Sequence, residues 1–270
     1  MEGVLKWAGQ EHSPNTVLDD TNIDLVNLQA AAQSQGPGSI RSHLDIIHEA
    51  TKIERQLIGW SDIIPLSWLP VHMSGVECTP PSISQPLLLY QNHCHVYPTI
   101  KIASFWNKQR ISLIGTHLLI ISQLSHLPPS IQNATSIFAS RNQIQHLVDD
   151  ICACIPFHLG GKIKPGSIGD KKVAYPHAAR EEVRQSHYQM APAQGGFQLL
   201  GPLGTLLEMG TRVEMRKGQR EWIGGQVMSV ARIYNLGKWV MIEILFKGMD
   251  SVLIGFLRKD VKYDASGKVI

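Results

Sequence analysis

The sequence carries little charge of either sign and almost no surplus of one sign over the other. Its 270 residues include 25 Lys and Arg, 22 Asp and Glu, and 12 His, which gives a formal net charge of +3 with neutral histidines. A protein that binds nucleic acid through its own surface usually carries a larger basic surplus. Composition therefore gives no support for direct binding of DNA or RNA by this chain.

Long apolar runs and cysteine are also scarce. The longest apolar stretch, residues 111–124, is interrupted by Ser, Thr, His and Gln, so it predicts a buried helix rather than a membrane span. The first residues contain no apolar run of the length that a signal peptide needs. Four cysteines are too few for a disulfide scaffold, so we expect a reducing compartment, the nucleus or the cytoplasm.

The remaining composition is that of a globular protein. Hydrophobic residues make up 43% of the chain and charged residues 17%, and the mean hydropathy is −0.05. These values are too apolar for a disordered chain and too polar for a membrane bundle. The length allows one large domain or two small ones.

Apolar residues recur at helical spacing along most of the chain, which predicts an all-α fold, an irregular array of about six helices. Residues 1–20 are polar and aperiodic and predict a flexible N-terminal arm. After this arm we expect a helical domain over residues 21–237 and an atypical C-terminal extension over residues 238–270. The expected helices cover residues 24–31, 39–61, 99–124, 131–154, 196–209 and 219–235.

Proline and glycine mark the expected connections. Pro65 and Pro70 predict an extended segment between them, and residues 71–93 and 161–186 predict loops. Gly195-Gly196 fits the start of a helix or a point where two backbones pack closely. After residue 237, the β-rich runs 239–246 and 252–257 favour a short hairpin, although a helix also fits either run.

The densest group of potential metal ligands is His93-Cys94-His95, with His72 and Cys78 upstream. Imidazole and thiolate are good zinc ligands. However, residues one and two positions apart do not converge on one ion without a tight loop. We therefore predict no metal site, and no sequence feature indicates a cofactor.

Cysteine and glycine motifs also fail to indicate catalysis. Cys152 with His158 or His146 has the residue types of a nucleophile and its base, but no nucleophile elbow or oxyanion turn accompanies them. Cys152-Ala153-Cys154 lacks the spacing of a redox motif and fits a buried helix. No glycine-rich phosphate loop is present. We predict no catalytic residues and no enzyme activity.

Four stretches carry a family resemblance, and they occur in order between about residues 45 and 237. They are Leu57–Trp60 with Ile64–Pro70, Val96-Tyr97 with Ala103–Arg110, Val148–Gly160, and Ala193–Leu203 with Gln219–Ile223. Together they resemble the C-terminal, all-helical regulatory region of fungal zinc-cluster transcription factors.

This resemblance implies a fungal transcription-factor-like regulatory domain over residues 21–237. Such a domain would act in the nucleus through protein partners or a small effector, in the regulation of a metabolic gene cluster. The tryptophans would be apolar anchors, and Asn107 and Arg110 would tie a buried helix face to a neighbour. The expected structural anchors are Trp60, Trp68, Trp106, Asn107, Arg110, Cys152, Pro156, Gly195, Gly196 and Trp222.

Two departures from the family limit what the resemblance implies. The six-cysteine zinc cluster is missing from this sequence, so DNA recognition by this chain alone is not implied, and both a fragment of a longer factor and a stand-alone regulator stay open. Residues 238–270 do not look like the family's helical end. The alternative is an accessory protein or enzyme of fungal secondary metabolism, with a polar pocket around His93, His95, Cys152 and His158.

Overall fold

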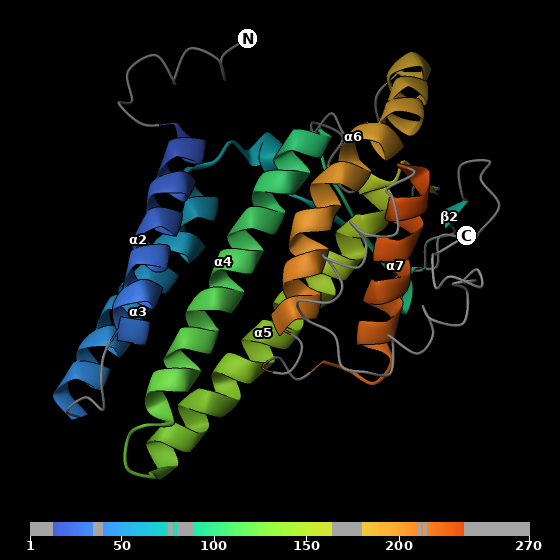
Figure 1. Cartoon of the computed structure of the whole chain (residues 1–270). Helices are drawn as coiled ribbons and strands as arrows, with labels where there is room; N and C mark the ends of the chain where they lie inside the picture. The colour runs from blue at the N-terminus through green and yellow to red at the C-terminus, as the bar shows by residue number, and fades with distance from the viewer. Residues whose placement is uncertain are drawn as a thin grey trace, which may run out of the picture. The chain divides into compact units, whose positions relative to one another are not determined.

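The computed structural model describes residues 13–34, 40–74, 78–79, 89–163, 180–209, 212 and 215–234. These residues form six α-helices and two small two-stranded sheets (Figure 1). The all-α fold class is therefore confirmed. The chain divides into two compact units, Met1–Pro202 and Leu203–Ile270. The C-terminal residues expected to form a hairpin lie outside the described residues, as do residues 1–12 of the expected arm.

The first unit begins with helices α2 (Pro14–Ser34) and α3 (Ile40–Ile63), which run antiparallel. α2 starts inside the segment expected to be a flexible arm, and it is longer than the predicted helix over 24–31. Proline fits the first turn of a helix, and the Ser13 hydroxyl accepts a hydrogen bond from the Thr16 amide at 3.3 Å. The indole Nε1 of Trp60 on α3 donates to the Pro14 carbonyl at 2.8 Å, which fixes this first turn.

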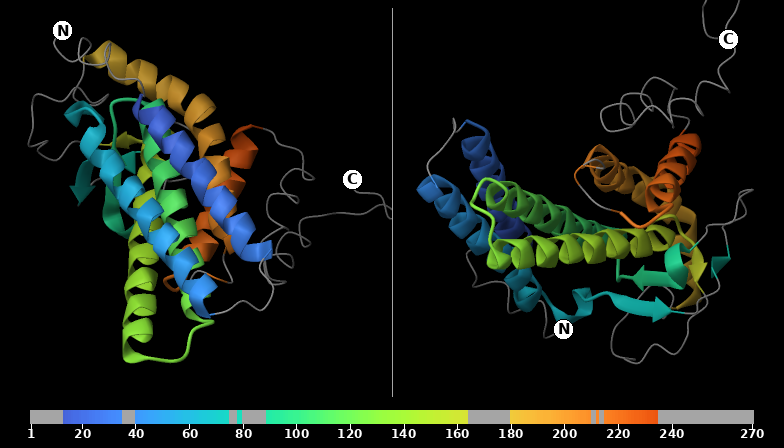
Figure 2. Two further views of the ribbon diagram at one scale, coloured as in Figure 1. Left: turned by 90° about the vertical axis from the view of Figure 1, so that its left-hand side faces the viewer. Right: turned by 90° about the horizontal axis from the view of Figure 1, so that it is seen from below.

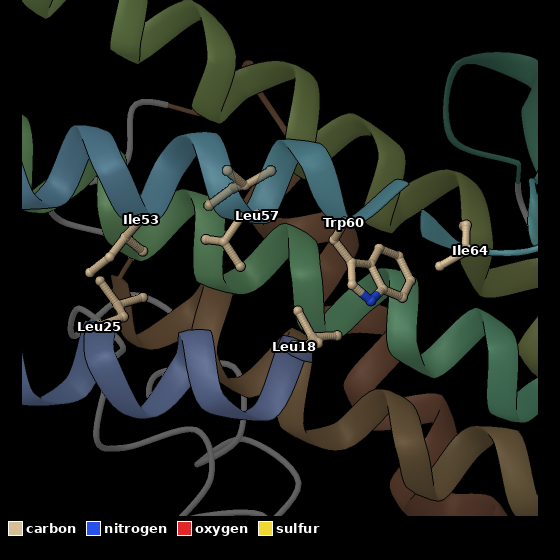
Figure 3. Close-up of a cluster of buried hydrophobic side chains, with 7 residues drawn as sticks. Leu18, Leu25, Ile53, Leu57, Trp60 and Ile64 are labelled. Carbon is tan, nitrogen blue, oxygen red and sulfur yellow. The ribbon is translucent and has the colours of Figure 1, made fainter. Parts of the chain in front are cut away.

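The core between these helices is made of aliphatic side chains around Trp60 (Figure 3). They come from one face of α2, from the facing side of α3 and the residue directly after it, and from α4 (Ile100–Leu124). Burial of each such side chain stabilises the fold by about 1.5–3 kcal/mol. The buried members of this cluster are Leu18, Leu25, Ile53, Leu57, Trp60, Ile64 and Leu113.

Helices α4 and α5 (Ile131–His158) form a helical hairpin and lie side by side (Figure 2). Thr99 caps α4 by accepting from the Ile102 amide, and Ser130 caps α5 by accepting from the Asn133 amide. Both helices start where the sequence predicts. α5 does not end near Cys154, however, but continues through Pro156 to His158.

The second core of this unit lies where α2 ends, α3 begins, α4 ends and α5 begins. Its buried members are Ile46, Ala50, Leu119, Ile120 and Leu124. Leu28 and Ala32 of α2 and Ile137 of α5 pack against it. All four helices therefore contribute apolar side chains to the interior at this end of the unit.

A strand pair occurs where the sequence predicted only a loop. β1 (Val71–Ser74) pairs antiparallel with β3 (His93–Val96), with His72 opposite His95. Each strand is too short to show a clear alternating pattern, and β3 also packs against α5. The expected extended segment after Pro65 is instead a 3-10 turn, η1 (Leu66–Trp68).

Two further short segments complete the connections of the first unit. A second 3-10 turn, η2 (Tyr90–Asn92), precedes β3. β2 (Cys78–Thr79) pairs antiparallel with β4 (Lys162–Ile163), which follows α5.

Helix α6 (Glu181–Glu208) begins earlier than the sequence predicted, inside the expected loop over 161–186. Gly195 lies in its interior rather than at its start. A Cβ atom at Gly195 would lie 2.1 Å from the carbonyl oxygen of His158 at the end of α5. The structure thus supports close backbone packing, one of the two explanations open for Gly195-Gly196. Gly160, with φ of +67°, approaches α6 in the same region.

The second unit contains the last residues of α6 and helix α7 (Gln219–Ile233). α7 begins at the predicted residue, directly after Gly218, which has a φ of +78° that glycine adopts readily. Both helix segments bury apolar side chains: Leu203, Leu206, Leu207, Ile223, Val227 and Val230.

Candidate functional site: a buried polar network on α4

Helix α4 buries an unusual number of polar side chains. These are Asn107, Gln109, Arg110, Ser112, Thr116, His117 and Gln123. Buried polar groups need partners, and those on α4 reach several neighbouring elements. Gln109 donates to the Leu57 carbonyl of α3 at 3.1 Å, and Gln123 pairs with His43 of α3 at 2.7 Å. The helix therefore joins its neighbours by hydrogen bonds as well as by apolar contact.

Arg110 is the centre of the most connected part of this network. Only 2% of the residue is exposed. Its Nη1 donates to the Tyr97 hydroxyl at 2.8 Å and to the Asn107 side-chain oxygen at 3.1 Å, and its Nη2 lies 3.4 Å from Nδ1 of His95. The guanidinium also lies 5.6 Å from the Trp106 ring centroid, a cation–π distance.

The Arg110 charge is balanced by Asp150 of α5. Arg110 Nε lies 3.6 Å from the carboxylate, whose side chain is 42% exposed. The other carboxylate oxygen lies 3.8 Å from Nε2 of His95. The partly exposed His72 ring packs edge-on against His95, with 4.2 Å between the ring centroids. This side of the network, unlike Arg110 itself, reaches the surface.

Cys154 closes the network on its inner side. Asn107 Nδ2 donates to the Cys154 sulfur at 3.0 Å, and the thiol lies 3.0 Å from the Ile151 carbonyl oxygen, which can accept from it. Asn107 and Cys154 are both fully buried. The pair therefore fixes the register of α4 against α5.

The protonation states of these groups favour a structural role. Burial raises the pKa of the Cys154 thiol to about 11 and raises the pKa of Tyr97 above its usual range. Burial, with the Arg110 charge nearby, lowers the pKa of His95 to about 2. At neutral pH the thiol and phenol are thus protonated and this imidazole is neutral, so neither a thiolate nucleophile nor an imidazolium acid is present among these three groups.

The four side chains suggested for an enzyme pocket differ in burial and in their partners. His95 belongs to the network, whereas His93 is exposed at the start of β3. His158 is fully buried and bonds the Cys154 carbonyl through Nδ1 at 3.1 Å, and burial lowers its pKa to about 4. Cys152 is fully buried on α5.

Three of the four expected tryptophan anchors lie together. Trp60 is fully buried and meets Trp106 edge-on, with 5.3 Å between the ring centroids. Trp106 is partly buried and donates to the Trp68 carbonyl at 2.8 Å. Trp68 stacks on Phe105. Trp222, the fourth, is partly buried on α7 in the second unit.

The remaining expected anchors lie near the end of α5 and on α6. Pro156 is buried inside α5. Gly195 and Gly196 are both buried on α6. Pro156 and Gly195 thus lie in the segments where α5 and α6 approach each other.

Sequence reasoning missed most partners of Asn107 and Arg110, namely Tyr97, His95, Asp150 and Cys154. One signal was present. Asp150 and Cys154 are four residues apart, so they lie on one face of α5, and Asn107 and Arg110 are three apart on α4. Two such polar pairs on adjacent apolar helices are consistent with a shared buried network.

The described part of the chain has neither a metal-ligand group nor a membrane span. No group of three His, Cys, Asp or Glu side chains there is arranged to hold a metal ion. None of the helices described has the length and apolar character needed to cross a bilayer.

Comparison with known proteins finds a similarity to a fungal protein. The chain is 26% identical over 131 residues to the transcription factor dbaG of Emericella nidulans. The aligned region covers 48% of this chain and 30% of dbaG. No family model matches the sequence, and no solved structure matches it. The chain is therefore similar to part of a fungal transcription factor, and this similarity does not define a particular domain.

Proposed function

We propose that this chain is a helical regulatory module of the fungal transcription-factor type, which acts in the nucleus through protein partners or a small effector. The observation that carries the proposal is the similarity to dbaG. The all-helical fold is consistent with it. Because the match covers 30% of dbaG, the activities of that whole protein are not transferred to this chain.

The buried network is consistent with the proposed regulatory role. Arg110, Asn107 and Cys154 are enclosed by the fold, and they join α4 to α5 and to the segment before α4. Such a network specifies one packing of the helices, which a partner-binding module requires. In this proposal the chain is not an enzyme, and its metabolic role is control of a gene cluster.

The alternative function is an accessory protein or enzyme of secondary metabolism. The observation in its favour is the pairing of His95 with Asp150 beside the partly exposed His72. A histidine–carboxylate pair is a common acid–base arrangement. The lowered pKa of His95, about 2, argues against this use, because a general base needs a pKa nearer the working pH.

A DNA-binding measurement tests one part of the proposal. The purified chain should show no sequence-selective retention of a random duplex library in a gel-shift experiment. Its small charge surplus gives little non-specific affinity at physiological salt. Enrichment of one DNA motif by the wild-type chain would contradict the proposal.

A reporter measurement tests the regulatory role itself. The full chain is fused to an unrelated DNA-binding domain in a fungal host, and transcription from a promoter that carries its site is measured. The fusion should raise or lower transcription relative to the DNA-binding domain alone. An unrelated helical domain of similar size in the same fusion is the control and should have no effect.

A further inference from the structure

Three aromatic side chains near the end of α3 and the start of α4 are covered only in part by the fold. Trp68, Phe105 and Trp106 are each partly buried. Trp68 stacks on Phe105 with 6.0 Å between the ring centroids, and the Trp106 indole donates to the Trp68 carbonyl. Leu66, in the same 3-10 turn as Trp68, is 79% exposed. We call Trp68, Phe105 and Trp106 the aromatic surface.

The N-terminal segment joins the first unit beside this surface. The Pro14 carbonyl, in the first turn of α2, accepts a hydrogen bond from the Trp60 indole at 2.8 Å. Trp60 in turn meets Trp106 edge-on, with 5.3 Å between the ring centroids. Leu18, on the next turn of α2, belongs to the same core cluster as Trp60 (Figure 3). Residues 1–12 are therefore tethered next to the aromatic surface.

The tethered segment contains side chains that suit such a surface. Residues 1–12 include Val4, Leu5 and Trp7 among polar neighbours. Trp7 lies six positions before Ser13, and six extended residues reach at most about 20 Å. The large ring of tryptophan gains from burial against other aromatic rings. A short tether also raises the local concentration of the segment far above that of a separate molecule.

We propose that residues 4–8 dock on the aromatic surface of the same chain, with Trp7 packed against Trp68 and Phe105. The tether and the three adjoining rings distinguish this surface from the aliphatic side chains that α2 and α3 expose elsewhere. The docked segment acts as a strap, because its release uncovers the rings. All the groups in this contact belong to the first unit.

Thiol labelling of the full chain tests this contact. Ser67→Cys places a thiol between Leu66 and Trp68, at a position that is exposed in the described structure. The docked strap should shield this thiol. Adding Trp7→Ala should therefore speed its labelling on the order of tenfold, because the loss of the main anchor releases the strap.

Ser122→Cys is the matched control. Ser122 is also exposed, and it lies near the opposite end of α4 from Phe105. Its labelling rate should be the same with and without Trp7→Ala. The native thiols of Cys94, Cys152 and Cys154 are buried, and peptide mass spectrometry identifies which cysteine has reacted.

Three results would overturn the proposal. The first is a Ser67→Cys labelling rate that Trp7→Ala leaves unchanged. The second is an equal acceleration at Ser67→Cys and Ser122→Cys, since Trp7→Ala would then loosen the whole fold. The third is shielding that grows with protein concentration from about 1 to 100 μM, since the segment would then come from another copy. None of these results depends on the proposed regulatory function.

Discussion

The Asp150→Asn substitution isolates the charge that balances Arg110. The change keeps the size and shape of the side chain and removes its negative charge. Arg110 is 2% exposed, and Asp150, whose carboxylate lies 3.6 Å from its Nε, is its acidic partner among the described residues. His95 cannot offset the loss of the negative charge by giving up a proton, because its lowered pKa already keeps the ring neutral.

The expected loss of stability follows from the burial of the two partners. Removing one member of a fully buried ion pair costs about 3–5 kcal/mol. Exposed pairs contribute at most about 1 kcal/mol. Arg110 is buried and the Asp150 side chain is 42% exposed, so we expect a loss of about 1–2 kcal/mol in the free energy of unfolding.

Urea unfolding followed by circular dichroism measures this loss. Asp149→Asn is the matched control, because Asp149 is adjacent on α5 and accepts a hydrogen bond from Gln145 at 2.8 Å, which an amide oxygen also accepts. The control should cost less than about 0.5 kcal/mol. Equal losses for the two variants would refute the reasoning that Asp150 balances a buried charge.

Three further predictions concern packing and protonation. Gly195→Ala should destabilise by about 3 kcal/mol in urea unfolding, because its Cβ would lie 2.1 Å from the His158 carbonyl oxygen, whereas Gly201→Ala meets open space and should gain up to about 1 kcal/mol. Trp60→Phe loses the bond to Pro14 and should cost about 1–2 kcal/mol, with faster hydrogen exchange at the start of α2. His158 has a pKa of about 4 when folded and about 6.5 when unfolded, so the unfolded chain binds the proton first and stability should fall as pH drops from 6.5 to 4. His158→Asn should make this decline shallower, and an unchanged slope would contradict the assignment.

Helix α4 shows what the sequence predicts well. The apolar rhythm predicts a helix over 99–124, Pro128-Pro129 cannot continue it, and the observed helix covers Ile100–Leu124. The structure adds Thr99 as the N-cap. The helix expected from Ile131 also begins at that residue, where Ser130 is the N-cap.

The two elements that were missed differ in their causes. The start of α2 carries local signals, because Ser13 caps the helix and Pro14 fits its first turn, and the Trp60 indole adds a contact from far away in the sequence. Gly195 continues α6, although glycine disfavours helices, where a residue without Cβ fits against His158. Only tertiary packing shows this second case.

In the candidate site, too, some residues could be predicted from the sequence and others depend on tertiary packing. The resemblance nominated Asn107 and Arg110, which are central to the buried network. Tyr97 and Cys154, which bond to them, come from the segment before α4 and from α5. Spacing on a single helix indicates which residues share a face, but the packing of two helices determines which faces meet.

Transcription from the tethered reporter is the most direct test of the proposed regulatory role. The wild-type fusion should change reporter output, and the fusion that carries Trp60→Ala, which removes the largest side chain of the core cluster, should lose that effect at equal protein level. Ile58→Glu, on the surface, should retain it. If the wild-type fusion gives the same output as the DNA-binding domain alone, the chain does not regulate transcription in this way.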